Sequence, residues 1–168
     1  MWHGAPQSPL PYRRTQLGGV VIGAITALTI VEAAIFVLVA IATDLPFEVA
    51  YLFGAVFVFL IALVVLFGWL SVAVDETAIH LAFGAGLVRR TISIQQVALA
   101  EPVRNRWWWG WGIRWTGGGW MWNVSGLDAV EVTYRDSKRF RIGAADPSGL
   151  AAAITQAITK TNRRPLRD

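Results

Sequence analysis

The sequence predicts an α+β membrane protein, in which a two-helix transmembrane hairpin near the N-terminus precedes a basic, strand-rich domain that ends in a helix. Two long apolar runs predict the hairpin, and a change to period-two alternation after them predicts the strands. The chain of 168 residues is 55% apolar, against about 45–50% in soluble domains. Its mean hydropathy is +0.48. A chain of this length cannot bury such an excess in its own core, so a bilayer is expected to take it.

The first predicted span covers residues 17–43 and contains one charged residue, Glu32, while the second covers residues 49–70 and contains none. At 1.5 Å per helical residue, each run is long enough to cross roughly 30 Å of hydrocarbon. A cleaved signal peptide is the alternative for the first run, with residues 40–42 as the cleavage site. That run is much longer than the roughly 7–15 apolar residues that signal peptides use.

The charges around the spans predict their orientation. The external turn, residues 44–48, carries only negative charge, whereas arginine pairs lie before the first span and after the second. Because positive flanks stay in the cytoplasm, we expect a multi-pass protein of the cell membrane with both termini cytoplasmic, including the N-terminal segment 1–16.

Glu32 is expected near the middle of the bilayer, where an ionised carboxyl costs several kcal/mol. Gly19, Gly23 and Ala27 form a stripe of small residues on the opposite side of the helix. If that stripe packs against the second span, Glu32 points outward. Its carboxyl is then either protonated and bonded within its own helix, or an intramembrane contact for self-association or for a partner.

Seven short strands are predicted after the spans, near residues 78–83, 87–94, 97–103, 112–116, 120–124, 129–135 and 139–143. Asp146 is expected to cap a helix that begins at Pro147 and continues through an alanine-rich amphipathic segment. The charged tail, residues 161–168, is expected to be disordered.

Several short motifs carry a family resemblance: Val74-Asp75-Glu76, Phe83-Gly84, Gly110-Trp111-Gly112-Ile113-Arg114-Trp115, Asn123-Val124-Ser125-Gly126, and Ile142-Gly143 with Asp146-Pro147 and Leu150. On these motifs the chain resembles the bacterial family of PH-domain-containing membrane proteins, in which two transmembrane helices commonly precede a PH-like domain. The resemblance implies that residues 71–160 form a PH-like β-barrel of about seven antiparallel strands, capped by a C-terminal helix. It implies no catalytic residues.

Seven of the nine tryptophans lie between residues 107 and 122. Some must pack in a core, but Trp107, Trp108 and Trp109 cannot all face one side of a strand. With Arg104 and Arg106 before them, they predict a loop that dips into lipid headgroups, with indoles in the interface and guanidinium groups on phosphates. The alternative is that the tryptophans fill the barrel or pack against the spans.

Further basic side chains, Lys138, Arg139 and Arg141, flank the last hairpin and form either a second lipid or partner contact or a solvated positive surface. The domain carries too little net charge and no recognisable module for nucleic-acid binding. Because the chain has no cysteine and two histidines far apart in sequence, we expect no metal site and no cofactor.

These observations predict a non-enzymatic membrane-anchored adaptor whose PH-like domain binds anionic lipid or a protein partner at the inner membrane surface. The alternative is a small oligomeric transport or channel component that assembles through Glu32. The carboxylates of the domain have no partner histidine, so nothing in the sequence proposes acid–base catalysis.

Overall fold

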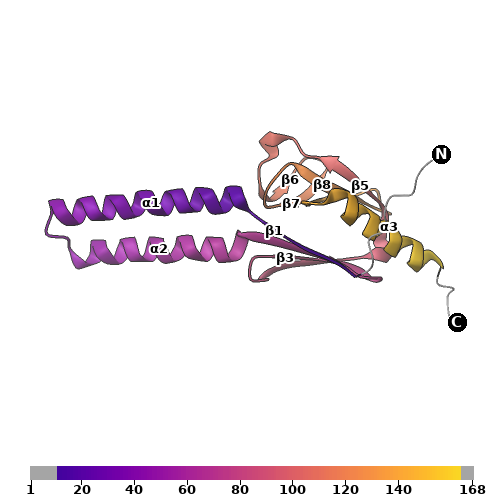
Figure 1. The fold of residues 1–168 in the computed structure, drawn as a ribbon, viewed down its shortest axis with the longest axis horizontal. Helices are drawn as coiled ribbons and strands as arrows, with labels where there is room; N and C mark the ends of the chain where they lie inside the picture. Colours follow the sequence, from indigo (N-terminus) through magenta and orange to yellow (C-terminus); the bar gives the residue numbers. More distant parts are fainter. Residues whose placement is uncertain (1–10, 164–168) are drawn as a thin grey trace.

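The computed structural model describes residues 11–163, which form an elongated molecule with a helical hairpin at one end and a domain of strands at the other (Figure 1). The hairpin consists of α1 (Gly19–Ala42) and α2 (Phe47–Phe67). Both helices are long and apolar enough to cross a membrane. No residue of α1 is buried, and Leu60 is the one buried residue of α2. They are therefore not core helices of the domain, and their apolar surface needs an apolar environment from outside the described chain.

The hairpin is inserted between two paired strands. β1 (Tyr12–Leu17) leads into α1, and β2 (Trp69–Val74) follows α2. The two strands are antiparallel, with Tyr12 opposite Val74 and Leu17 opposite Trp69. The Gly18 amide donates to the Gly68 carbonyl at 2.8 Å, so the pairing continues to the ends of the helices.

This insertion corrects two expected boundaries. Residues 12–17 of the N-terminal segment are a strand of the domain, and the second span ends at Phe67 rather than at residue 70. The alternation of buried and half-buried residues in Trp69–Val74 is that of a strand, since alternate side chains face the core. Residues 1–10 lie outside the described part of the chain.

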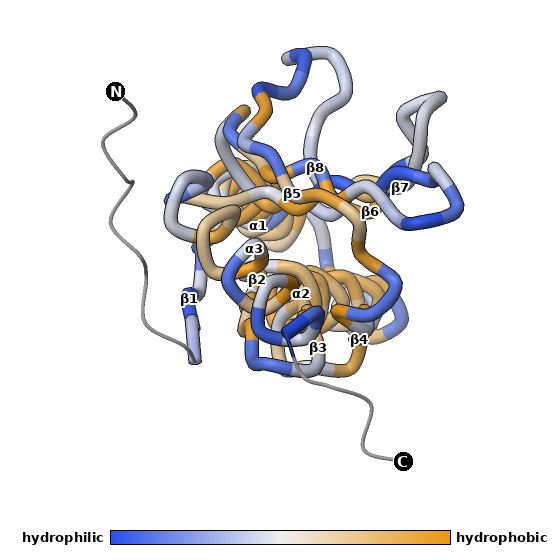
Figure 2. Tube along the Cα trace, turned by 90° about the vertical axis from the view of Figure 1, so that its right-hand side faces the viewer, coloured by the Kyte–Doolittle hydropathy of each residue, from blue (hydrophilic) through white to orange (hydrophobic). Residues whose placement is uncertain are grey.

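The strands form two sheets that lie in separate layers (Figure 2). The first has the order β1-β2-β3-β4 and the second β5-β8-β9-β7-β6. The remaining strands are β3 (Ala78–Phe83), β4 (Val88–Ser93), β5 (Val97–Arg104), β6 (Gly112–Trp115), β7 (Gly119–Asn123), β8 (Asp128–Tyr134) and β9 (Arg139–Gly143). Two short 3-10 helices, η1 (Ile94–Gln96) and η2 (Trp107–Trp109), lie on either side of β5.

All seven predicted strands are present, but the two sheets are not closed into a barrel. The expectation of antiparallel pairing throughout is also wrong, because β7 and β9 are parallel. Two sheets bury their facing apolar sides as well as a barrel does, and the separation leaves β4 and β6 as free edges.

The last helix, α3 (Pro147–Arg163), packs against β5, β8, β2 and η1. As predicted, Asp146 caps it: its Oδ1 accepts a hydrogen bond from the Gly149 amide at 2.8 Å. The helix includes residues 161–163 of the tail expected to be disordered. Residues 164–168 lie outside the described part.

The core connects directly to the hairpin through aromatic contacts. The ring centre of Phe67, at the end of α2, lies 6.0 Å from that of Phe83 in the first sheet. The ring centre of Phe83 lies 5.3 Å from that of Trp122 in the second sheet. Trp122 in turn lies 6.1 Å from Phe140. The hairpin is therefore packed onto the core of the domain rather than tethered to it by a linker.

Candidate functional site

The end of the domain that faces the hairpin is defined by contacts with the helix termini. The Ala85 amide, in the β3–β4 turn, donates to the Val65 carbonyl of α2 at 3.0 Å. The Gln16 side chain, just before α1, donates to the Ser125 carbonyl in the β7–β8 loop at 2.8 Å. If the helices span a bilayer, these turns lie next to its surface.

The tryptophan loop, residues 104–109, lies at this same end. Its Asn105 amide donates to the Leu127 carbonyl at 2.7 Å, and the Trp111 indole N–H that follows it donates to the Gly126 carbonyl at 3.2 Å. Trp107 and Trp108 are 72% and 58% exposed, and their rings pack edge to face. Of the two interpretations of the tryptophan cluster, core packing therefore describes Trp122 but not these two residues.

Arg104 and Arg106, on the same loop, are exposed. The Arg106 guanidinium lies 5.2 Å from the centre of the Trp108 ring. Neither arginine forms an ion pair with any residue between 11 and 163. The loop thus presents two indoles and two arginines whose charges are not neutralised by the described carboxylates.

Arg141 supports this loop from the sheet beneath it. Its Nε donates to Glu131 at 2.7 Å, and its Nη1 donates to Asn105 Oδ1 at 3.3 Å. The guanidinium also lies 4.7 Å from the centre of the Trp109 ring. Glu131 is 13% exposed and lies 3.5 Å from Arg139 as well. Arg141 and Arg139 are therefore held by a carboxylate, and Arg141 with Trp109 forms the base of the loop.

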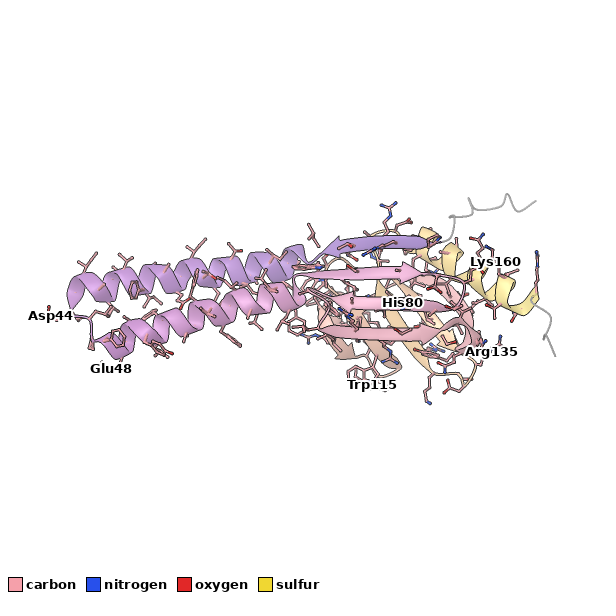
Figure 3. All side chains as sticks on the ribbon, turned by 90° about the horizontal axis from the view of Figure 1, so that it is seen from below. Asp44, Glu48, His80, Trp115, Arg135 and Lys160 are labelled. Carbon is pink, nitrogen blue, oxygen red and sulfur yellow. The ribbon has the colours of Figure 1, made fainter. Side chains whose placement is uncertain are left out.

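Lys138 lies away from the tryptophan loop. It pairs with Asp136 at 2.7 Å in the β8–β9 turn. The hydrogen bond from Lys138 holds the pKa of the Asp136 carboxyl below its ordinary value, and the same bond raises the pKa of Lys138. Arg135, at the start of this turn, lies at the end of the molecule opposite the acidic hairpin tip of Asp44 and Glu48 (Figure 3). The structure thus divides the basic residues that the sequence grouped together.

Glu32 faces the second helix rather than pointing outward. The less exposed residues of α1 recur with the spacing of a helix–helix seam, at Ile22, Ile25, Thr29, Glu32, Phe36 and Val39. Aromatic packing fills that seam, since Phe36 lies 5.3 Å from Phe53 of α2. The stripe of Gly19 and Gly23 is exposed and has no neighbour within 4 Å of an added Cβ. The small stripe therefore does not pack against α2, so the condition under which Glu32 would point outward is not met.

Both carboxyl oxygens of Glu32 are buried, and neither has a hydrogen-bond partner within the described chain. The hydroxyl of Thr29, the nearest polar residue to Glu32 along α1, already donates to the Ile25 carbonyl at 2.9 Å. A pocket of about 260 Å³ adjoins Glu32 and is lined by Phe36, Ala50, Gly54 and other apolar residues. An orphaned carboxyl beside an open pocket is suited to accept or donate a hydrogen bond from outside the hairpin.

A second polar cluster was not anticipated from the sequence. Asp75 Oδ2 lies 2.9 Å from His80 Nε2, and His80 Nδ1 lies 3.4 Å from the Thr91 hydroxyl. Hydrogen bonds from the Thr77 side chain and amide, with smaller contributions from Ala78 and His80, hold the pKa of the Asp75 carboxyl far below its ordinary value. The Asp75 and His80 side chains are 45% and 49% exposed, so the cluster is a solvated turn without the desolvation typical of catalytic groups.

Within residues 11–163, no group of three or more acidic or histidine side chains is placed to hold a metal ion. Comparison of the chain with protein-family models, with curated proteins and with solved structures finds no match. Function must therefore be argued from the geometry of the hairpin and of the domain end that adjoins it.

Proposed function

We propose that this protein is a non-enzymatic, membrane-anchored adaptor. The hairpin spans the cell membrane with both chain ends in the cytoplasm, and it holds the domain against the inner leaflet, where the tryptophan loop contacts anionic headgroups. The observation that carries the proposal is the exposure of Trp107 and Trp108 at the end of the domain from which two exposed apolar helices emerge. Beside them lie Arg104 and Arg106, which form no ion pair with the described residues 11–163.

The chemistry of the loop suits a headgroup layer. Indole rings favour the membrane interface, and each arginine near an anionic surface contributes about 1 kcal/mol. Two spanning helices already hold the domain at the membrane essentially irreversibly. The loop therefore sets the tilt of the domain and the face that it turns toward a protein partner.

A PH-like domain is part of the same proposal. The sequence motifs support it, and so does the C-terminal helix, which packs beside two sheets whose strands are mostly antiparallel. The separation of the sheets differs from a closed barrel and leaves an edge open between β4 and β6. The acidic β2–β3 turn, with Asp75 and Glu76, argues against specific phosphoinositide recognition at that position.

The absence of cysteine from the sequence allows a sharp test. In the full chain, Trp108→Cys introduces a single cysteine, which is labelled with a nitroxide. The labelled protein is then reconstituted into nanodiscs of phosphatidylcholine and phosphatidylglycerol. The proposal expects the label to be accessible to oxygen and protected from a water-soluble nickel complex. Ser137→Cys, in the β8–β9 turn, is the matched control and should show the reverse.

If the label at position 108 is as accessible to the nickel complex as the label at 137, the loop does not contact lipid and the proposed orientation fails. A membrane-impermeant maleimide tests the topology separately in sealed vesicles of known orientation. A cysteine at Asp44 should react from outside, and one at Ser137 should not. Reaction of both or the reverse pattern would contradict cytoplasmic termini.

The orphaned carboxyl of Glu32 favours a second candidate, a small oligomeric transport or channel component that assembles through this residue. A protonated carboxyl in one copy can pair with that of another, each donating one hydrogen bond. This candidate expects an oligomer for the wild type in detergent and in nanodiscs, retained in Glu32→Gln and lost in Glu32→Ala. A monomer in all cases would remove it.

A further inference from the structure

A cavity of about 440 Å³ lies where the hairpin meets the domain. Its walls come from both helices and both sheets: Ile25 of α1, Phe67 of α2, Phe83 of β3, Ile113 of β6 and Trp111 just before β6. Its size falls in the range of ligand pockets, about 300–1,000 Å³, and its lining is predominantly apolar and aromatic, as in such pockets.

The position of the cavity along the helices defines what surrounds it. Val21 and Ile25 lie in the first two turns of α1, and Leu63 and Phe67 lie in the last two turns of α2. In the proposed topology these turns cross the inner leaflet. The cavity is thus lined by membrane helices on one side and by the domain on the other, at the depth of inner-leaflet acyl chains.

The cavity adjoins one edge strand of the domain, because Gly112 and Ile113 of β6 line it. β4 and β6 are edge strands of their sheets and lie on the same side of the molecule (Figure 2). α3 packs against β5, at the opposite edge of the second sheet. At the open edge, Trp115 and Trp120 are 61% and 46% exposed and pack edge to face.

Arg90, on the edge strand β4, supplies a positive charge at this edge, although it is not one of the residues that line the cavity. Arg90 faces the interior between the sheets, with its guanidinium 4.5 Å from the centre of the Phe140 ring and Nη2 3.5 Å from the Tyr134 hydroxyl. It is half-buried, and no carboxylate of the described chain forms an ion pair with it. Val88 pairs with Phe83, which lines the cavity, so Arg90 lies two residues, about 7 Å, farther from the bilayer.

We propose that this cavity and Arg90 form a binding site for one anionic phospholipid of the inner leaflet. An acyl chain occupies the cavity between the helices and the domain, and the phosphate lies toward Arg90. The apolar lining at membrane depth recognises the chain, and a half-buried arginine without a carboxylate partner recognises the anion. The inference rests on the membrane placement proposed above, and it is separate from the lipid contact of the tryptophan loop.

The test uses the purified full chain in a mild neutral detergent, with phosphatidylglycerol or phosphatidylcholine of identical chains added, and native mass spectrometry to count retained lipids. The wild type should retain one phosphatidylglycerol, about five-fold more strongly than phosphatidylcholine, as one arginine–phosphate contact provides. Ile25→Trp fills the cavity and should abolish retention of both lipids. Arg90→Gln should keep lipid retention but lose the preference for the anion.

Two matched controls isolate the site. Leu38→Trp adds the same bulk to a lipid-facing position of α1 that is 66% exposed and lies outside the cavity lining. Arg89→Gln removes a neighbouring charge that is exposed on the other face of β4. Both should retain lipid as the wild type does. If Ile25→Trp disturbs the near-ultraviolet circular dichroism spectrum, Val21→Phe fills the cavity from the preceding turn.

Equal retention of the two lipids by the wild type, or unchanged retention in a folded cavity-filling variant, would overturn the proposal. The two lipid hypotheses fail separately. A water-exposed label at position 108 together with retained phosphatidylglycerol would contradict only the lipid contact of the tryptophan loop. A lipid-protected label together with no retained phosphatidylglycerol would contradict only the cavity site.

Discussion

The hairpin and the domain use the same apolar residue types in opposite ways. In α1 and α2 the large side chains are exposed, as with Leu38 at 66% and Phe59 at 61%. In the domain the corresponding side chains are buried, as with Phe83 and Phe140 at 1% each. The difference teaches that the surroundings, rather than the residue types, decide what an apolar side chain does: lipid is expected to cover the first set, and the facing sheet covers the second.

The two regions meet over a short and well-packed junction. Gly18 and Gly68 join the ends of the helices, and Phe67 inserts next to Phe83. The strands on either side of the hairpin are each other's neighbours, so the domain cannot fold completely without bringing the two helices together. A fragment that starts at residue 71 lacks β1 and part of β2, and we expect it to be unstable.

The contrast between buried and exposed apolar side chains predicts the largest difference in stability for a matched pair of phenylalanine substitutions, one in the domain and one in the hairpin. Phe83→Ala removes a ring in contact with Phe67 and Trp122 and should lower the free energy of unfolding of the domain by about 3–5 kcal/mol. Phe59→Ala, on the exposed surface of α2, should change it by less than about 0.5 kcal/mol. Denaturant titration in detergent, followed by tryptophan fluorescence, measures both. Equal effects of the two substitutions would mean that the hairpin surface is covered by protein.

The junction predicts the next effect. Gly84 has φ +48°, and an added Cβ would clash with the carbonyl oxygens of Val65 and Leu66. Gly84→Ala should therefore cost about 2–3 kcal/mol and expose the β3–β4 turn to hydrogen exchange. Gly117 has φ +80° but no neighbour within 4 Å, so Gly117→Ala isolates the backbone strain and should cost about 1 kcal/mol. Identical losses would show that helix and turn are not packed together.

A smaller effect is expected from the Asp75 turn, which lies at the end of the first sheet away from the hairpin. Because the folded-state pKa of Asp75 is lowered, its contribution to stability is present above its unfolded pKa of about 4 and is lost as the pH falls through the lower folded value. Asp75→Asn should cost about 1 kcal/mol at neutral pH. It should also reduce the loss of stability below about pH 4. Thermal unfolding from pH 7 to pH 3 measures this; an unchanged acid slope would contradict the assignment.

The local pattern of the sequence was sufficient for most elements but not for those defined by distant pairing. Seven strands and the Asp146 cap follow from alternation and from turn residues close by. β1 was missed because its partner, β2, lies 52 or more positions away, across the inserted hairpin. β2 was missed because the alternation in Trp69–Val74 follows an apolar helix without a polar break. Residues 69 and 70 were therefore assigned to the span, and no strand was predicted at residues 71–74.

The candidate site shows the same limit. The sequence assigned Arg104 and Arg106 to the tryptophan loop and placed Arg141 in a separate basic group at the last hairpin. The structure instead brings Arg141 beneath the loop, where its cross-strand neighbour Glu131 holds it. Likewise, three successive tryptophans predicted that at least one is exposed without indicating which. Trp109 is half-buried because it packs on Arg141, a residue from a strand formed later in the chain.

The smallest effect on stability is expected for the exposed tryptophans of the tryptophan loop, which do not pack in the core of the domain. Trp107→Ala with Trp108→Ala should change the free energy of unfolding by less than about 0.5 kcal/mol, because both rings are exposed and contact mainly each other. The same double variant should lose quenching of tryptophan fluorescence by lipids brominated near the headgroup. Trp122→Phe, in the core, should do the opposite, lowering stability while leaving the quenching unchanged. If removing Trp107 and Trp108 lowers stability as much as altering Trp122 does, the loop belongs to the core of the domain. If it abolishes quenching without lowering stability, tryptophans of one segment pack against protein on one side and contact lipid on the other.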